Sequence, residues 1–131
     1  TDLEEIKRVF VEQPHKLSLN EFYLVARTYE PGTAEFTEVF EKAVRLFPRD
    51  KTANLNAANA AMRRGNHDAA RRYLARAGDS AEAVYARGAL AIREKDYAAA
   101  VRHMKRADAM GLREAEAILA ELKERGYLEK Q

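Results

Sequence analysis

The sequence predicts an all-α protein built as an array of helical hairpins, and three observations carry this prediction. Alanine is abundant and runs of β-branched residues are absent, which favours helix almost throughout. The 3 prolines stand where helices would end. The pattern of residues 53–77 returns elsewhere at a nearly fixed interval, as it does in repeat proteins. We therefore expect the 131 residues to form one domain whose core is a continuous seam between repeats.

The interval between the copies is thirty residues on the C-terminal side of the central copy and thirty-four on the other side. A shift of thirty residues places Ala58 on Gly88 and Leu74 on Met104. The four-residue difference corresponds to about one helical turn. We place the missing turn at the end of the second helix of the central hairpin, where Gly78 comes early.

A leading helix precedes the repeats and ends before Pro14. The first repeat then begins at a capping-box spacing, in which Ser18 and Glu21 each satisfy the other's backbone N–H. The helix that starts there runs to about Tyr29. Thr33 is placed to cap the second helix of this repeat, which ends at Pro48.

The two later repeats are hairpins with short turns, at residues 64–68 and at Lys95 and Asp96. Gly78 suits a left-handed cap, and Asp79 or Ser80 caps the helix after it. A last helix has one apolar stripe and otherwise polar residues, as a terminal cap of an array needs. The expected boundaries are 1–14 for the leading helix, 17–48, 51–78 and 80–110 for the repeats, and 112–127 for the capping helix.

The hairpin pattern resembles the tetratricopeptide repeat (TPR), which has a small residue midway along its first helix. Ala58 and Gly88 match that position. In the second helix the family has alanine and then a bulky residue four positions later. The matching pairs are Ala70 with Leu74, Ala100 with Met104 and, more loosely, Phe36 with Phe40, followed by Ala43 and Pro48. The resemblance covers residues 17–110 and implies an α–α superhelix, a TPR-like solenoid of about three hairpins with an extra helix at each end.

The sequence also departs from that family. Asn20, Asn54 and Val84 replace the aromatic residue that usually opens the first helix, and Arg87 stands where a leucine is expected. A Sel1-like repeat or another α-hairpin repeat is therefore an alternative.

Two stretches resemble the C-terminal helical repeat region of uncharacterised Bacteroides-type cell-envelope proteins. These stretches are LSLNEFYLVARTYEPGTAEF and RLFPRDKTANLNAANAAMRRG. The resemblance implies a periplasmic or outer-membrane-associated setting and gives no activity. Because the first residue is Thr1 and not methionine, we also expect the chain to be processed or part of a longer one.

The sequence offers no catalytic or metal-binding pattern. Ser18 and Ser80 are both placed as helix caps, and a nucleophile would need a base and an orienting group within reach. The histidines are isolated, without the spacing that puts two ring nitrogens on one helical face. These histidines are His15, His67 and His103. We therefore expect no enzyme, no metal site and no cofactor.

Basic residues gather in the middle of the chain, where residues 51–110 hold 12 basic and 6 acidic side chains. Neither a groove-reading motif nor interleaved stacking aromatics accompany them, so we expect no nucleic-acid partner. The cations concerned are Arg71, Arg72, Arg76, Arg102, Lys105 and Arg106. No window approaches the roughly 18 uncharged apolar residues of a membrane span, so we expect no direct membrane insertion.

Three asparagines in the first helix of the central repeat are the most informative polar residues. Asn54, Asn56 and Asn59 each favour a helix interior less than alanine does, by roughly some tenths of a kcal/mol. They either hydrogen-bond an extended peptide or tie neighbouring helices together. The TPR resemblance implies that first helices line a concave groove. The candidate partner-binding residues there are Phe22, Val25, Tyr29, Asn56, Asn59, Arg63, Tyr85 and Arg93.

Chaperone-binding TPR proteins hold a C-terminal carboxylate with lysine and asparagine side chains. Only Asn56 fits that set, because Glu21, Val25, Glu82 and Ala86 replace its other members. We therefore predict a non-enzymatic scaffold module that binds a peptide or partner protein, with a role in cell-envelope assembly. The alternative is a structural spacer or self-association domain of a larger envelope protein.

Overall fold

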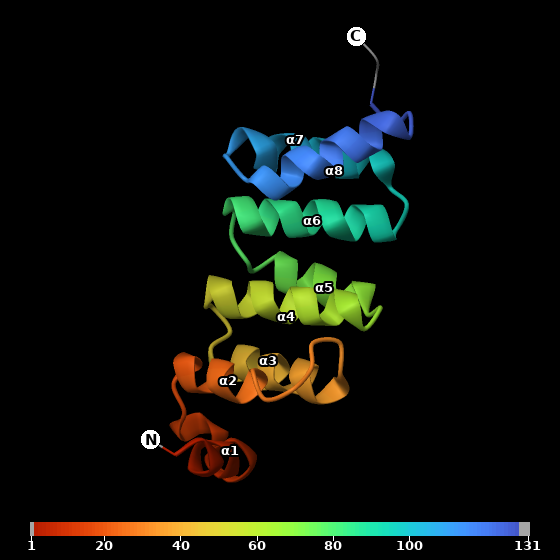
Figure 1. Ribbon diagram of the computed structural model, residues 1–131. Helices are drawn as coiled ribbons and strands as arrows, with labels where there is room; N and C mark the ends of the chain where they lie inside the picture. The colour runs from red at the N-terminus through yellow and green to blue at the C-terminus, as the bar shows by residue number, and fades with distance from the viewer. Residues whose placement is uncertain (1, 129–131) are drawn as a thin grey trace. The chain divides into compact units, whose positions relative to one another are not determined.

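The computed structural model describes residues 2–128, which form eight α-helices, one short 3₁₀ turn and no strand. The prediction of an all-α protein is confirmed. The chain divides into two compact units, residues 1–77 and 78–131. Unit 1 contains α1 to α5 and unit 2 contains α6 to α8 (Figure 1). The expectation of one domain over residues 1–131 stays a prediction.

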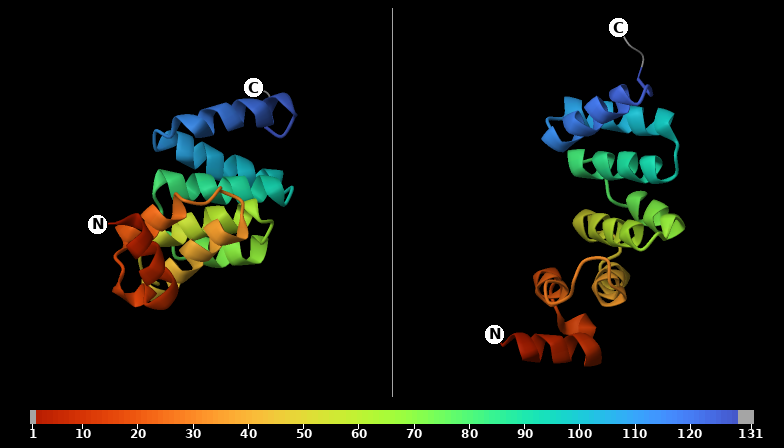
Figure 2. Two further views of the ribbon diagram at one scale, coloured as in Figure 1. Left: turned by 60° about the horizontal axis from the view of Figure 1, so that its bottom comes forward. Right: turned by 45° about the vertical axis from the view of Figure 1, so that its right-hand side comes forward.

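In unit 1, each element packs mainly against the next one along the chain. Figure 2 shows α2 and α3 side by side, viewed nearly end-on in its right panel. The elements of unit 1 are α1 (Leu3–Glu12), the 3₁₀ turn η1 (Pro14–Lys16), α2 (Leu19–Ala26), α3 (Ala34–Leu46), α4 (Lys51–Arg63) and α5 (His67–Leu74).

Two helices of unit 1, α2 and α3, begin at the caps that the sequence predicts. Ser18 Oγ accepts a hydrogen bond from the Glu21 amide at 3.3 Å, and the Ser18 amide donates to Glu21 Oε1 at 2.9 Å. This reciprocal pair is a complete capping box. Thr33 Oγ1 accepts from the Phe36 amide at 3.2 Å and so caps α3.

The core of unit 1 is built around Phe22, which is fully buried. Its ring meets those of Phe10 and Phe47 edge to face, with centroids 5.7 Å and 6.3 Å away. Residues from α1 to α4 complete this core. They include Ile6, Leu17, Val25, Ala26, Val39, Phe40, Ala43, Val44, Ala53, Ala57 and Ala60.

One polar side chain, Asn54, is fully buried in unit 1. Its Nδ2 donates hydrogen bonds to the carbonyl oxygens of Pro48 at 3.0 Å and Asp50 at 2.9 Å. These bonds hold the link between α3 and α4 against the start of α4. Of the two roles considered for the helical asparagines, Asn54 therefore has the structural one, because its side chain ties neighbouring segments of the protein together.

The end of α2 differs from the sequence-based expectation. The helix stops at Ala26 instead of continuing to about Tyr29. The Thr28 hydroxyl donates to the Val25 carbonyl oxygen at 2.7 Å, and the Thr28 and Tyr29 amides bond to carbonyls three residues back. Such bonds tighten and close a helix end. The link to α3 consequently spans residues 27–33.

The register of the first repeat also differs from the sequence-based expectation. α2 begins 32 residues before α4, not the thirty-four that the sequence alignment gave. Because each residue of an α-helix turns by about 100°, a two-residue slip rotates the exposed face by roughly 200°. Phe22 and Val25 therefore take the places of the buried Asn54 and Ala57.

Unit 2 consists of α6, α7 and α8, and each helix again packs on its chain neighbour. Ser80 Oγ caps α6 through the Ala83 amide at 3.1 Å, and Asp96 Oδ1 caps α7 through the Ala99 amide at 3.2 Å. The helices are α6 (Ala81–Arg93), α7 (Tyr97–Ala109) and α8 (Arg113–Glu124). The buried core residues include Val84, Ala91, Ala100, Met104, Ala107, Ala115 and Leu122.

The α6–α7 hairpin is closed by a close approach of Gly88 and Met104. A Cβ built on Gly88 would lie 2.8 Å from Met104 Cε and 3.1 Å from Met104 Sδ. Only a residue without a side chain leaves Met104, which is fully buried, in its present place.

The thirty-residue offset between the two later hairpins is retained. α4 and α6 both contain 13 residues, and α5 and α7 begin 30 residues apart. However, α5 contains 8 residues and α7 contains 13. The missing turn thus lies at the end of α5, as the sequence predicts. Gly78 has the predicted positive φ of 76°, although the C-cap of α5 is Ala75.

Candidate protein-binding surfaces

The polar face of α4, made of Asn56, Asn59 and Arg63, is the first candidate surface. Spacings of three and four residues place these side chains on one side of the helix. Asn59 and Arg63 are exposed and Asn56 is half-buried. Much of the remainder of α4 consists of buried small residues, Ala53, Ala57, Ala58, Ala60 and Ala61. The helix therefore presents amide and guanidinium groups outward on an alanine base.

Tyr23 of α2 joins this face through Asn56. Burial raises the pKa of the Tyr23 hydroxyl, the charge of Asp50 raises it further, and a hydrogen bond with the Asn56 side chain opposes both. The Tyr23 ring lies 6.0 Å from that of Phe40, centroid to centroid. The hydroxyl end of Tyr23 thus meets α4 while its ring packs on α3.

The predicted site residues fall into three groups, which are buried core residues, half-buried tyrosines and polar residues that reach the surface. Phe22 and Val25 have 0% exposure and belong to the core of unit 1, so they are not part of the candidate surface. The two-residue slip of α2 turns them inward. In their place Leu24 of α2 and the C-cap residue Arg27 are exposed.

The two predicted tyrosines are half-buried and have structural contacts. Tyr29 follows α2, and the Lys7 ammonium lies 5.6 Å from the centre of its ring. Tyr85 packs against the core of unit 2. Arg93 is exposed at the end of α6. The structure thus brings Asn56, Asn59 and Arg63 together within unit 1.

A hollow beside Tyr73 was not anticipated from the sequence. It lies in unit 1 between α3 and α5, has a volume of about 220 Å³ and is open to solvent. Burial raises the pKa of Tyr73, Glu41 raises it further, and Arg72 and Arg45 oppose the shift. Arg64, one of its lining residues, donates to the Gly32 carbonyl oxygen at 3.2 Å. Tyr73 follows two alanines and two arginines in α5, and no sequence motif marks it.

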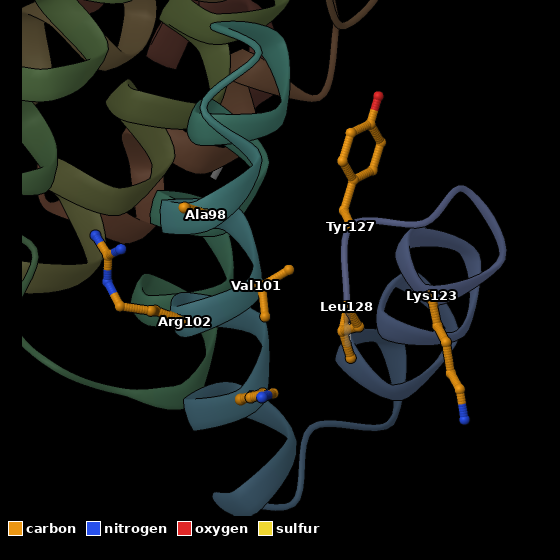
Figure 3. A pocket seen from close by; sticks show the side chains of 7 residues that line it. Ala98, Val101, Arg102, Lys123, Tyr127 and Leu128 are labelled. Carbon is orange, nitrogen blue, oxygen red and sulfur yellow. The ribbon is translucent and has the colours of Figure 1, made fainter. Parts of the chain in front are cut away.

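A second unanticipated feature is a cationic hollow in unit 2, which we call the basic hollow. It has a volume of about 520 Å³ and lies beside α7 and the end of α8. Figure 3 shows Val101 and Leu128 in its middle, with Arg102 on one side and Lys123 on the other. The described residues that line it are Ala98, Val101, Arg102, Lys105, Lys123, Tyr127 and Leu128.

A stacked pair of tyrosines fixes one wall of the basic hollow. The rings of Tyr97 and Tyr127 are nearly parallel, with centroids 3.9 Å apart and planes at 13°. The Tyr127 amide also donates to the Leu122 carbonyl oxygen at 3.0 Å, which ends α8. The segment after α8 is thereby held against the start of α7.

The environment of His103 reports the positive charge along α7. Burial lowers the pKa of His103, and Arg102, Arg87 and Arg106 lower it further, while Asp96 acts in the opposite direction. Like charges disfavour the protonated imidazole. The charged groups that shift this pKa are three arginines and one aspartate, so the charges near His103 are mainly positive.

The sequence matches no protein-family model, and no curated protein is found as a relative of the chain. Within residues 2–128, no cluster of three or more metal-binding side chains is present. None of the helices in this part of the chain has the length and apolar character needed to cross a membrane.

Proposed function

We propose that the chain is a non-enzymatic protein-interaction module, and that the polar face of α4 binds an extended segment of a partner protein. The observation that carries the proposal is that two asparagines, Asn59 exposed and Asn56 half-buried, share one face in the interior of a helix. Alanine would favour the helix more at both positions, by roughly some tenths of a kcal/mol each. Neither asparagine caps a helix, and both present amide groups that can pair with a peptide backbone.

The neighbouring residues suit this role. Arg63 adds a donor two helical turns from Asn56, and Tyr23 adds a hydroxyl group from α2. An extended peptide buried against such a face needs partners for its own N–H and C=O groups, since each unpaired group costs about 1–3 kcal/mol. Asn side chains supply both a donor and an acceptor.

The proposal includes membership of the TPR-like class of helical arrays. It is supported by the thirty-residue offset between the α4–α5 and α6–α7 hairpins, by the small residues Ala58 and Gly88, and by contacts that join each helix to its chain neighbour within a unit. The role in cell-envelope assembly stays a prediction from the sequence.

Selection from a displayed library of peptide segments tests the proposal. We expect the native chain to enrich peptides that the Asn56→Ala/Asn59→Ala variant no longer binds. The variant should remain folded by circular dichroism, because both changes favour helix. The matched control is Gln13→Ala/Asn20→Ala, which also removes two exposed amides from unit 1.

If the variant and the control retain the same peptides as the native chain, the α4 face is not the binding surface and the proposal fails. Sedimentation at several concentrations examines the alternative role in self-association. A concentration-dependent dimer that the Asn56→Ala/Asn59→Ala change leaves intact, together with no enriched peptide, would favour the spacer role.

A further inference from the structure

We infer that the basic hollow of unit 2 is a second docking surface, which takes an extended acidic segment with apolar side chains between its carboxylates. The inference goes beyond the proposed function, which concerns the α4 face. It rests on the described lining residues, their charge and the directions in which they point.

The lining combines an apolar floor with cations at its edges. Ala98, Val101, Arg102 and Lys105 lie at spacings of three, four and seven residues and therefore share one side of α7. Val101 and Leu128 are half-buried, whereas Arg102, Lys105 and Lys123 are exposed. The floor can take up small apolar side chains while the edges face charged ones.

The positive charge of the hollow arises from segregation, because unit 2 has no excess of cations. Residues 78–128 contain 9 basic and 9 acidic side chains. Two of the acids are engaged elsewhere, since Asp79 pairs with Arg87 at 3.2 Å and Glu121 with Arg125 at 2.9 Å. Asp96 caps α7. None of the described residues that line the hollow is acidic, so this lining carries three cations and no carboxylate.

The directions of the cations favour an extended chain over a small anion. In Figure 3, Arg102 and Lys123 point to opposite sides of the hollow. A single phosphate or carboxylate needs donors that converge within hydrogen-bond distance. Cations spread along two edges can instead pair with several carboxylates of one segment, each placed near a different edge.

Stacking of nucleic-acid bases is not favoured at this surface. Tyr127 is the aromatic residue of the lining, and its ring is already stacked on Tyr97 at 3.9 Å. Binding of single-stranded nucleic acid commonly combines basic grooves with aromatic rings that are free to stack. The apolar floor of Val101 and Leu128 suits the side chains of a peptide better.

The test uses a short fluorescent peptide in which glutamates alternate with leucines, titrated into the full chain and followed by fluorescence anisotropy. We expect saturable binding that weakens with salt. The Arg102→Glu/Lys105→Glu variant should bind about tenfold more weakly or worse, because two attractive contacts become repulsive. Lys123→Glu, on the opposite edge, should weaken binding in the same direction.

Three controls separate this inference from simpler explanations. Lys16→Glu/Lys51→Glu reverses two exposed cations of unit 1 and should leave the affinity unchanged. A peptide with serine in place of leucine should bind more weakly than the parent peptide. The Asn56→Ala/Asn59→Ala variant should bind the acidic peptide normally, so that failure at one surface can be told from failure at the other.

Absence of binding, or equal losses in the Lys16→Glu/Lys51→Glu control, would overturn the inference. So would a serine peptide that binds as tightly as the leucine peptide, because charge alone would then suffice. Tighter binding of inorganic polyphosphate or of a single-stranded oligonucleotide of matched charge would assign the hollow to another class of ligand.

Discussion

The hairpins α4–α5 and α6–α7 share a first helix of 13 residues and the same turn, but their second helices contain 8 and 13 residues. Leu74, the last residue of α5, corresponds to Met104 of α7. The extra residues of α7, 105–109, begin with Lys105 of the basic hollow. The comparison shows that the hairpin is a common scaffold, whereas the surface is set by how far its second helix continues.

The two hairpins also pack their helices differently. Ala58 and Leu74 occupy the positions that Gly88 and Met104 occupy in unit 2, and all four residues are buried. A longer, flexible side chain is matched in α6–α7 by a residue without a Cβ. The two facing positions therefore differ together between the hairpins, a smaller residue on the first helix accompanying a longer one on the second.

The largest predicted effect comes from breaking this packing in unit 2. Met104→Ala should lower the free energy of unfolding by about 2–5 kcal/mol, because it removes a fully buried side chain. Adding Gly88→Ala to that variant should recover part of the loss. The new methyl group would lie 2.8 Å from the native position of Met104 Cε, so it partly fills the space that the methionine leaves. Urea unfolding followed by circular dichroism measures both.

Gly88→Ala alone supplies the control for this cycle. It should destabilise the protein by about 1 kcal/mol, because overpacking outweighs the gain in helix propensity. An equal change in the free energy of unfolding for Gly88→Ala in the native chain and in the Met104→Ala variant would show that the two residues do not interact. Such a result would contradict the packing account.

A smaller effect is expected at the turns. Gly65 and Lys95 follow the C-caps of α4 and α6 with φ of 77° and 62°. In each turn the next amide bonds to a carbonyl five residues back, from Asn66 to Ala61 at 2.9 Å and from Asp96 to Ala91 at 2.8 Å. This Schellman geometry favours glycine, and the lysine bears the strain of a left-handed backbone.

Lys95→Gly should therefore raise the free energy of unfolding by up to about 1 kcal/mol, and Gly65→Ala should lower it by about 1 kcal/mol. Thermal unfolding of the two variants beside the native chain measures the difference. Lys95→Ala is the matched control, because it removes the lysine side chain but keeps the left-handed strain. If Lys95→Ala stabilised the protein as much as Lys95→Gly, charge and not backbone strain would be the cause.

The smallest predicted effect concerns His103 in α7, the longer of the two second helices. Its pKa is lowered in the folded chain, so the unfolded chain takes up a proton first as the pH falls through the ordinary histidine value of about 6.5. The free energy of unfolding should decline over that interval and be unaffected at higher pH. Because the ring is half-exposed, the decline should be small.

Titration of His103 by NMR checks this directly, and His103→Gln should flatten the pH dependence. The Arg102→Glu/Lys105→Glu variant should move the pKa of His103 upward, because it replaces an adjacent positive charge by a negative one. An unchanged pKa in that variant would contradict the influence assigned to Arg102 on His103.

Features encoded by neighbouring residues were predictable from the sequence. The capping box of Ser18 and Glu21 and the cap at Thr33 depend on residues three positions apart, so a spacing suffices to find them. The short α5 followed from the early Gly78 in the same way. These signals can be recognised without knowing which helices pack against each other.

Features that depend on register or on several helices were not predictable. Phe22 and Val25 are in the core because α2 begins 32 residues before α4, whereas the sequence alignment has a single offset of thirty-four for the whole first repeat. An alignment with one period per repeat cannot detect such a difference. The basic hollow joins Arg102 of α7 to Lys123 of α8. Neither residue is distinctive alone, and only the packing of the two helices brings them to one hollow.

Because the helices within each unit pack mainly on their neighbours along the chain, both units should fold quickly. Contacts between adjacent helices close only short loops, so little chain entropy is lost before the first contacts stabilise the structure. A nucleus can form in any hairpin and grow one helix at a time. A ribosome-bound chain could therefore fold each helix pair as soon as it is synthesised, without waiting for distant segments.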